Sequence, residues 1–210
     1  MRLLITAGPT REAIDPVRFL TNRSSGKMGY SLAIAAVAAG HEVTLISGPT
    51  NLARPQGVKF LSIESAQEMF EAVRSEIHQM DLAIFSAAVA DYRPVVVADQ
   101  KIKKSDGRIT LELERTPDIL GSMRSFGYKG ALVGFAAETT DLIAHAGEKL
   151  ARKGCDLIVA NDVSRPDIGF DVDHNAVTLL FADGRIVPLP KLTKAQLAEK
   201  LIGECVNLVK

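Results

Sequence analysis

The sequence predicts an α/β fold: a Rossmann-like, three-layer arrangement with a mainly parallel central sheet, helices on both of its faces and added β-hairpins. Two observations carry this prediction. Short continuous apolar runs alternate along the chain with longer stretches of helical periodicity, which is typical of parallel strands buried on both faces. The chain shows no internal repeat, no low-complexity tract and no convincing linker, so we expect residues 1–210 to form one domain.

The predicted strands are short apolar runs that end at turn residues. The first covers residues 3–6 and stops at a Gly-Pro turn. The second is followed by Ser47-Gly48-Pro49, which again ends a strand. The predicted parallel strands are residues 3–6, 43–46, 58–63, 82–86, 131–135 and 156–160.

The predicted helices begin and end at recognisable capping residues. Apolar residues recur at helical spacing over residues 28–39, and Gly40 ends that helix as a C-terminal glycine. Ser65 and Glu68 form a capping-box pattern ahead of a second amphipathic helix. A third helix is predicted over about residues 142–153.

Two stretches depart from the alternation of strand and helix. Residues 108–115 alternate apolar with polar, which predicts one strand of a hairpin beside the main sheet. Residues 177–181 and 185–188 flank Asp183-Gly184, which predicts a hairpin with a type I′ turn. Thr193 then begins a capping box for the last helix.

Composition narrows the class of protein. The chain has 25 basic and 25 acidic residues, so its net charge is zero, and this argues against nucleic-acid partners, which require a basic face. No apolar run reaches the roughly 20 residues that span a bilayer. Met1 leads directly into a predicted strand, so we expect no signal peptide. Cys155 and Cys205 are expected as buried thiols. We therefore expect a cytoplasmic protein with small-molecule substrates and no membrane partner.

A glycine-rich loop after the first strand predicts an anion site. Gly8 follows that strand, and Ser24-Ser25-Gly26 opens the next helix, with Gly29 in its first turn. Backbone N–H groups and the helix dipole converge at such a helix start and favour bound phosphate. Glycine allows the backbone to come close to the phosphate and the helix to pack on the sheet. The same glycines also suit a loop that binds nothing.

The spacing disfavours a nicotinamide dinucleotide. The dinucleotide fingerprint requires three glycines in a compact turn and an acidic residue after the second strand, where this chain has Ser47-Gly48-Pro49. A short-chain dehydrogenase would require a tyrosine with a lysine four residues later, and Tyr30, Tyr92 and Tyr128 lack it. The Walker pattern is absent too, because Met28 follows Gly-Lys. An NAD(P)-dependent oxidoreductase and a non-catalytic nucleotide-binding module remain as alternative functions.

Several longer motifs resemble a known family. They are Ile-Thr-Ala-Gly-Pro-Thr-Arg-Glu (5–12), Asp-Pro-Val-Arg (15–18), Asn-Arg-Ser-Ser-Gly-Lys-Met-Gly (22–29), Ala-Ala-Val-Ala-Asp-Tyr-Arg (87–93), Lys-Ile-Lys-Lys (101–104), Thr-Pro-Asp-Ile-Leu (116–120), Gly-Phe-Ala-Ala-Glu-Thr (134–139) and Ala-Asn-Asp-Val (160–163). In this order, spanning almost the whole chain, they closely resemble the bacterial phosphopantothenate–cysteine ligases (phosphopantothenoylcysteine synthetases). In many bacteria that unit is the C-terminal half of a bifunctional coenzyme A biosynthesis flavoprotein, so we expect this sequence to be either a stand-alone form or an excised domain.

The resemblance implies a two-step ligation and its partners. The carboxylate of 4′-phosphopantothenate attacks the α-phosphate of CTP with Mg²⁺, which gives an acyl-cytidylate and pyrophosphate. The amine of L-cysteine then displaces CMP and forms phosphopantothenoylcysteine. A homodimer and a fused or associated phosphopantothenoylcysteine decarboxylase are also implied. The preference for CTP over ATP rests on the resemblance alone, and the base that deprotonates the cysteine amine is not indicated.

The resemblance also implies roles for individual residues. Asn22 would stabilise the acyl-nucleotide through its amide, and Asp91 would contact the magnesium ion. Lys101, on a cationic stretch suited to a mobile lid, would contact nucleotide phosphate and serve catalysis. Arg18 is our hypothesis for the phosphate of 4′-phosphopantothenate, with a contact across the dimer interface as one arrangement. On residue type alone, Asn22 and Asp91 also suit turn formation and the lysines suit a solvated surface.

The remaining implied contacts divide between nucleotide and substrate. Ala87 and Ala88 would let backbone groups approach the pantothenate arm, and Asn22 would bind substrate as well. The nucleotide-binding candidates are Gly8, Ser24, Ser25, Gly26, Gly29, Lys101, Pro117, Asp118, Ile119, Leu120, Phe135, Lys149, Lys153 and Asn161.

Overall fold

A central sheet of eight strands organises the chain, and the computed structural model describes residues 1–104, 107–138, 140–162 and 174–209. Its strands are β1 (Arg2–Ala7), β4 (Glu42–Ser47), β5 (Val58–Ser62), β6 (Leu82–Phe85), β9 (Ala131–Glu138), β10 (Leu157–Asp162), β12 (Val177–Phe181) and β13 (Ile186–Pro188). Their order across the sheet is β13-β12-β10-β9-β6-β1-β4-β5. All pairs from β5 to β10 are parallel, and β12 and β13 add an antiparallel edge.

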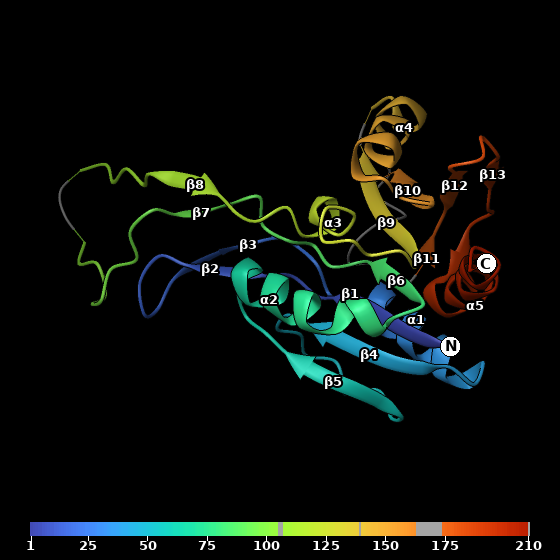
Figure 1. The fold of residues 1–210 in the computed structure, drawn as a ribbon. Helices are drawn as coiled ribbons and strands as arrows, with labels where there is room; N and C mark the ends of the chain where they lie inside the picture. Colours follow the sequence, from blue (N-terminus) through green and yellow to red (C-terminus); the bar gives the residue numbers. More distant parts are fainter. Residues whose placement is uncertain (105–106, 139, 163–173, 210) are drawn as a thin grey trace.

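Helices cover both faces of the sheet, so the predicted three-layer α/β fold is confirmed (Figure 1). α1 (Lys27–Ala38) and α5 (Lys194–Val206) pack on one face. α2 (Ala66–Glu76), α3 (Ile119–Ser122) and α4 (Leu142–Lys153) pack on the other, and a 3-10 turn at Ile77–Gln79 follows α2. No helix in the described part of the chain is both long and apolar enough to cross a membrane.

The two helical layers explain why the central strands are continuously apolar. In β1, Leu3 and Ile5 face the layer of α1 and α5, whereas Leu4 faces the layer of α2 to α4. All three side chains are completely buried. Burying each such side chain stabilises the fold by about 1.5–3 kcal/mol, so both faces of each strand must be apolar.

The helix ends agree with the predicted caps. Ser65 accepts a hydrogen bond from the N–H of Glu68, and Thr193 forms a reciprocal capping box with Gln196. Gly40 follows the end of α1 with a positive φ of 82°, as a glycine in that position does. These local signals therefore act as the sequence predicts.

The structure differs from the prediction for residues 108–115, which lie in a long arm outside the main sheet. The arm consists of two two-stranded ribbons and their connections. Only Leu113–Arg115 form a strand, β8, and it pairs with β7 (Tyr92–Pro94) in a ribbon separate from the main sheet. This ribbon and a second one, β2 (Arg11–Ala13) with β3 (Phe19–Thr21), extend together away from the sheet (Figure 1). None of the described helices forms a layer over the arm, so Ile109 and Leu113 stay exposed and alternation alone does not bring them to the core.

The turn at Asp183-Gly184 also differs from the prediction. A hairpin does join β12 to β13, but Gly184 has a φ of 91° and Asp183 has no positive φ. A type I′ turn requires positive φ at both central residues. Instead the N–H of Gly184 donates to Phe181 and the N–H of Phe181 donates to Arg185, which forms a longer loop closed by a left-handed glycine. A two-stranded ribbon of β11 (His174–Asn175) and β14 (Leu192–Thr193) precedes α5.

Candidate functional site

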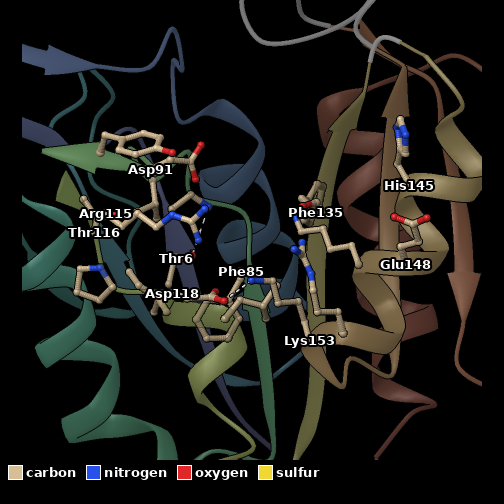
Figure 2. Close-up of a pocket in the computed structure, with 18 of the residues that line it drawn as sticks. Thr6, Phe85, Asp91, Arg115, Thr116, Asp118, Phe135, His145, Glu148 and Lys153 are labelled. Atoms are coloured by element: carbon tan, nitrogen blue, oxygen red, sulfur yellow. Dashed lines mark hydrogen bonds and ion pairs between the residues drawn. The ribbon is translucent and has the colours of Figure 1, made fainter. Parts of the chain in front are cut away.

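A cleft lies at the carboxyl ends of the parallel strands, where open α/β sheets bind ligands. It consists of two adjoining cavities. The large cavity has a volume of about 1110 Å³, and the glycine-loop cavity has about 450 Å³. Both are lined by Ala87, Val89, Asp91, Phe135 and Lys149, so they form one continuous cleft. Figure 2 shows the large cavity, with Asp91 and Arg115 on one wall and Phe135 and Lys153 on the facing wall.

The glycine loop brings the start of α1 to the smaller cavity. Gly26 is the N-cap residue with a φ of 75°, and no side chain caps the helix there. Gly29 packs α1 against β1, because a Cβ on it would lie 2.5 Å from the Cβ of Ala7. Gly8 lies under the loop next to Gly26, and its carbonyl accepts a hydrogen bond from the N–H of Ala88. The first N–H groups of α1 are therefore suited to an anion in the cavity.

Asn22 is held over the loop that follows β6. Its amide nitrogen donates to the carbonyl oxygens of Ala88, at 3.1 Å, and Val89, at 3.0 Å. The side chain lines the glycine-loop cavity together with Ala87 and Ala88. Both amide hydrogens are engaged within the protein, so donation to a bound acyl oxygen would require one of these two hydrogen bonds to break.

Asp91 lies at the junction of the two cavities. Its backbone carbonyl accepts from the N–H of Thr116 at 3.0 Å, and the Thr116 hydroxyl donates to Ala90 at 2.6 Å. These bonds join the loop after β6 to the start of α3. The Asp91 carboxylate is exposed, and the described residues contain no cluster of three His, Cys, Asp or Glu side chains. Such a single carboxylate fits a Mg²⁺ ion that takes its other ligands from phosphates and water.

The far wall of the large cavity carries cations from α4. Lys149 donates to the carbonyl oxygen of Phe135 at 2.7 Å, and Lys153, one turn later, pairs with Asp118. Asp118 also caps α3 by accepting from the N–H of Gly121 at 3.0 Å. Partial burial opposes ionisation of Asp118, but its hydrogen bonds with Lys153 and Gly121 outweigh burial and lower its pKa.

All four residues of the segment Pro117–Leu120 line this cavity, as does Phe135. Pro117 precedes the cap residue, and Ile119 begins α3. Free backbone groups are available at such a helix start. The structure thus brings all the predicted nucleotide residues except Gly8 and Lys101 to the wall of one cleft; Gly8 lies beneath the loop.

Arg18 and Lys101 line a different cavity, of about 530 Å³, on the arm. The Arg18 guanidinium contacts the Asp15 carboxylate at 2.5 Å and donates to the carbonyl of Ile102 at 3.0 Å. The hydrogen bonds from Arg18 hold the pKa of Asp15 well below its usual range. Lys103 and Lys104 line the same cavity, so the arm carries a cationic site of its own, and neither Arg18 nor Lys101 lines the cleft of the same chain.

Comparison with known proteins assigns the chain to a family. The model of the DNA/pantothenate metabolism flavoprotein C-terminal domain matches residues 1–208. The chain belongs to this family. It is 51% identical over 209 residues to the coenzyme A biosynthesis bifunctional protein CoaBC of Bacillus subtilis (strain 168), covering 99% of the chain and 52% of that protein. It is 44% identical over 212 residues to the CoaBC of Escherichia coli (strain K12), with the same two coverages. The chain therefore spans about half the length of these relatives.

Solved structures of the family share the fold. The C-terminal domain of a CoaBC protein is 47% identical, with a TM-score of 0.83 over 97% of this chain and 92% of that one. A DNA/pantothenate metabolism flavoprotein from Streptococcus pneumoniae is 25% identical, with a TM-score of 0.84 over 99% of both chains. Both share the observed arrangement of sheet and helices.

Several residues of the cleft were missed by sequence reasoning. In the large cavity, Arg115, Arg152, His145 and Glu148 line the walls, and Lys27 lines the glycine-loop cavity. Lys27 could have been identified, because it is the first residue of the helix that the glycine loop opens. Asn175 and Lys194 also line the glycine-loop cavity, but no local motif marks them.

Proposed function

We propose that this domain is a CTP-dependent phosphopantothenate–cysteine ligase of coenzyme A biosynthesis. One observation carries the proposal: a single cleft joins an uncapped helix start, Asn22, Asp91 and Lys149 in a chain 51% identical to a coenzyme A biosynthesis protein. A more distant neighbour of the same fold, a Cab2 mutant, was solved in complex with phosphopantothenate-cysteine. The ligand of that protein suits the reaction proposed here.

The proposed chemistry requires no protein nucleophile. In the first step a carboxylate oxygen of 4′-phosphopantothenate bonds to the α-phosphorus, and pyrophosphate leaves with the electron pair of the broken bond. In the second step the amine of cysteine attacks the acyl carbon, and CMP leaves. Both steps depend on positioning and on charge neutralisation. The cations of the cleft and the start of α1 supply that neutralisation.

The two cavities suggest how the nucleotide would lie. The glycine-loop cavity has the helix start that suits phosphates, whereas Phe135 and the backbone of Pro117–Leu120 in the large cavity suit a base. The acyl transfer would then take place near Asn22 and Ala88, next to both cavities. Mg²⁺ would bind at Asp91 and reduce the repulsion between phosphates and the attacking carboxylate.

The arm supports a homodimer as the working unit. Arg18 lies between β2 and β3 and Lys101 between β7 and β8, outside the cleft of their own chain, and both ribbons extend away from the sheet (Figure 1). The two ribbons and their connections expose apolar side chains that a second subunit could cover: Val17, Phe19, Val95, Val96, Val97, Ile109 and Leu113. In the proposed dimer the arm brings Arg18 and Lys101 to the cleft of the partner subunit. We further propose that the domain works in the cytoplasm, fused to or associated with a decarboxylase, as in its bifunctional relatives.

One feature disfavours the oxidoreductase alternative. In a dinucleotide site the ribose approaches the end of the second strand. Here β4 ends at Ser47, and a Cβ at the next residue, Gly48, would lie 1.8 Å from the carbonyl oxygen of Pro9. The loop after β1 therefore covers the place where an acidic residue would bind a dinucleotide.

Pyrophosphate release tests the proposal. The chain is mixed with 4′-phosphopantothenate, cysteine, Mg²⁺ and either CTP, ATP, GTP or UTP. We expect pyrophosphate release that requires 4′-phosphopantothenate and is fastest with CTP. Folded protein that releases none with any nucleotide would refute the ligase assignment, and release independent of 4′-phosphopantothenate would point to a simple nucleotide hydrolase.

A further inference from the structure

Two buried asparagines face the glycine-loop cavity with unpaired amide oxygens. Asn161, at the end of β10, is 7% exposed, and Asn175, in β11, is 4% exposed. Both line the cavity, and neither Oδ1 atom has a hydrogen-bond partner. A buried polar atom without a partner costs about 1–3 kcal/mol, so such atoms are rare unless a ligand completes them. The pair therefore indicates a binding position at this end of the cavity.

The charged residues around the two asparagines favour an anionic ligand. Lys27 and Lys194 are the first residues of α1 and α5, Lys149 projects from α4, and all three line the same cavity. Lys194 is only 6% exposed. Among the described lining residues the one carboxylate is Asp91, at the junction with the large cavity. With the positive end of the α1 dipole added, the asparagine end of the cavity attracts negative charge.

The asparagine side chains can serve such an anion directly. A carboxamide presents either its oxygen or its two N–H donors when it rotates about its last bond. A half-turn of either amide would exchange the unpaired Oδ1 for the NH₂ group, which can donate to a phosphate at the same place. Asn22 differs, since its NH₂ group is already bonded to Ala88 and Val89.

The distance between Asn161 and Asn22 indicates which phosphates of the nucleotide this end of the cavity would bind. Asn22 lies over the loop after β6, whereas Asn161 ends β10, two strands away in the sheet. Two strand spacings of about 4.8 Å separate these positions by about 10 Å. A single phosphate does not span this distance, but a polyphosphate chain extending from the reacting α-phosphate toward β10 does.

We propose that Asn175 and Lys194, together with Asn161, bind the β- and γ-phosphates of the nucleotide and hold the departing pyrophosphate. This deepens the proposed ligase function and rests on it for the nucleotide's orientation. When the carboxylate oxygen bonds to the α-phosphorus, the bond from that phosphorus to the oxygen bridging to the β-phosphorus breaks. The electron pair stays on the bridging oxygen, and the donors at this end of the cavity stabilise the charge that accumulates on pyrophosphate.

Binding of inorganic pyrophosphate is the direct test. Isothermal titration calorimetry of the full chain, with and without Mg²⁺, compares wild type with Asn175→Ala, Asn175→Asp and Lys194→Met. The matched control is Lys200→Met, an exposed lysine on the same helix as Lys194. We expect Asn175→Ala and Lys194→Met to weaken pyrophosphate binding about 10- to 100-fold, as the loss of a hydrogen bond to a charged group does, and the control to leave it unchanged.

The isosteric Asn175→Asp variant tests whether residue 175 donates to an anion. The substitution replaces the NH₂ donor with a carboxylate that repels phosphate, so this variant should bind pyrophosphate more weakly than Asn175→Ala. Circular dichroism verifies that each variant is folded, and Lys194→Met provides a second route if Asn175 variants do not fold. Pyrophosphate binding by Asn175→Asp that equals or exceeds wild type would overturn the proposal, as would wild-type protein that binds no pyrophosphate.

The test is independent of ligase activity, because it uses neither 4′-phosphopantothenate nor cysteine. Normal pyrophosphate binding with no ligation would refute the proposed function and leave this anion site in place. Conversely, the protein could be an active ligase whose pyrophosphate binding and KM for CTP are unchanged in Asn175→Ala and Lys194→Met. That result would refute the proposed pyrophosphate site and leave the ligase function in place.

Discussion

Replacing Gly29 with alanine would test how the glycine loop is built. The added Cβ would lie 2.5 Å from the Cβ of Ala7, 3.0 Å from its Cα and 3.1 Å from the carbonyl oxygen of Thr6. Carbon atoms in good contact are about 3.5–4.0 Å apart, so α1 would have to move from β1 by about 1 Å. Thr6 and Ala7 lie in an interior strand that is paired on both sides, so they cannot yield easily.

The expected magnitude combines two opposing effects. Overpacking of this kind costs about 1–3 kcal/mol, whereas replacing glycine in a helix by alanine gains about 1 kcal/mol. Gly29→Ala should therefore lower the free energy of unfolding by up to about 2 kcal/mol. Because the start of α1 would shift with the helix, the free energy of nucleotide binding should weaken by more than the free energy of unfolding falls.

Gly203→Ala is the matched control. Gly203 lies in α5, and a Cβ there would have no atom within 4 Å. It should raise the free energy of unfolding by about 0.5–1 kcal/mol through helix propensity and leave nucleotide binding unchanged. Urea denaturation and calorimetry with CTP measure both quantities. If Gly29→Ala stabilised the protein as much as Gly203→Ala, the close packing of α1 on β1 would not limit this site and the reasoning would fail.

Three further predictions concern other contacts of the cleft and the arm. Asn22→Asp should retain acyl-cytidylate formation but slow amide formation, which rapid-quench kinetics would show; an unaffected second step would exclude the assignment. Asp118→Asn should cost up to about 1 kcal/mol at neutral pH by removing a half-exposed ion pair. Because the folded-state pKa of Asp118 is lowered, that difference should be present above the ordinary carboxyl pKa and disappear on acidification through the folded-state pKa, as denaturation at several pH values would reveal. Arg18→Ala should raise the KM for 4′-phosphopantothenate with little change in that for CTP; an unchanged KM for 4′-phosphopantothenate would exclude this role.

Much of the fold could be predicted because its signals are local. Apolar runs mark β1, β4 and β6, and the capping residues Ser65 and Thr193 begin their helices where expected. The prediction was wrong where a strand-like pattern of apolar residues falls on a segment that is not buried. Residues 108–115 alternate like a strand, but only three of them form one, because none of the described layers covers the arm.

The candidate site shows the same division. The sequence by itself placed Asp91 at the cleft, because it follows the end of β6 and the carboxyl ends of parallel strands meet at one edge of the sheet. Asn22 and the glycines at the start of α1 lie in the long connection after β1, and the sequence marked them through the glycine pattern and the family motif. Only the tertiary structure decided that Asn175 and Lys194 reach the same cavity, and that Arg18 and Lys101 lie apart from it. The physical reason is that the antiparallel strand β12 and the packing of α5 on α1 bring distant residues together, and no periodicity or cap within the chain encodes that contact.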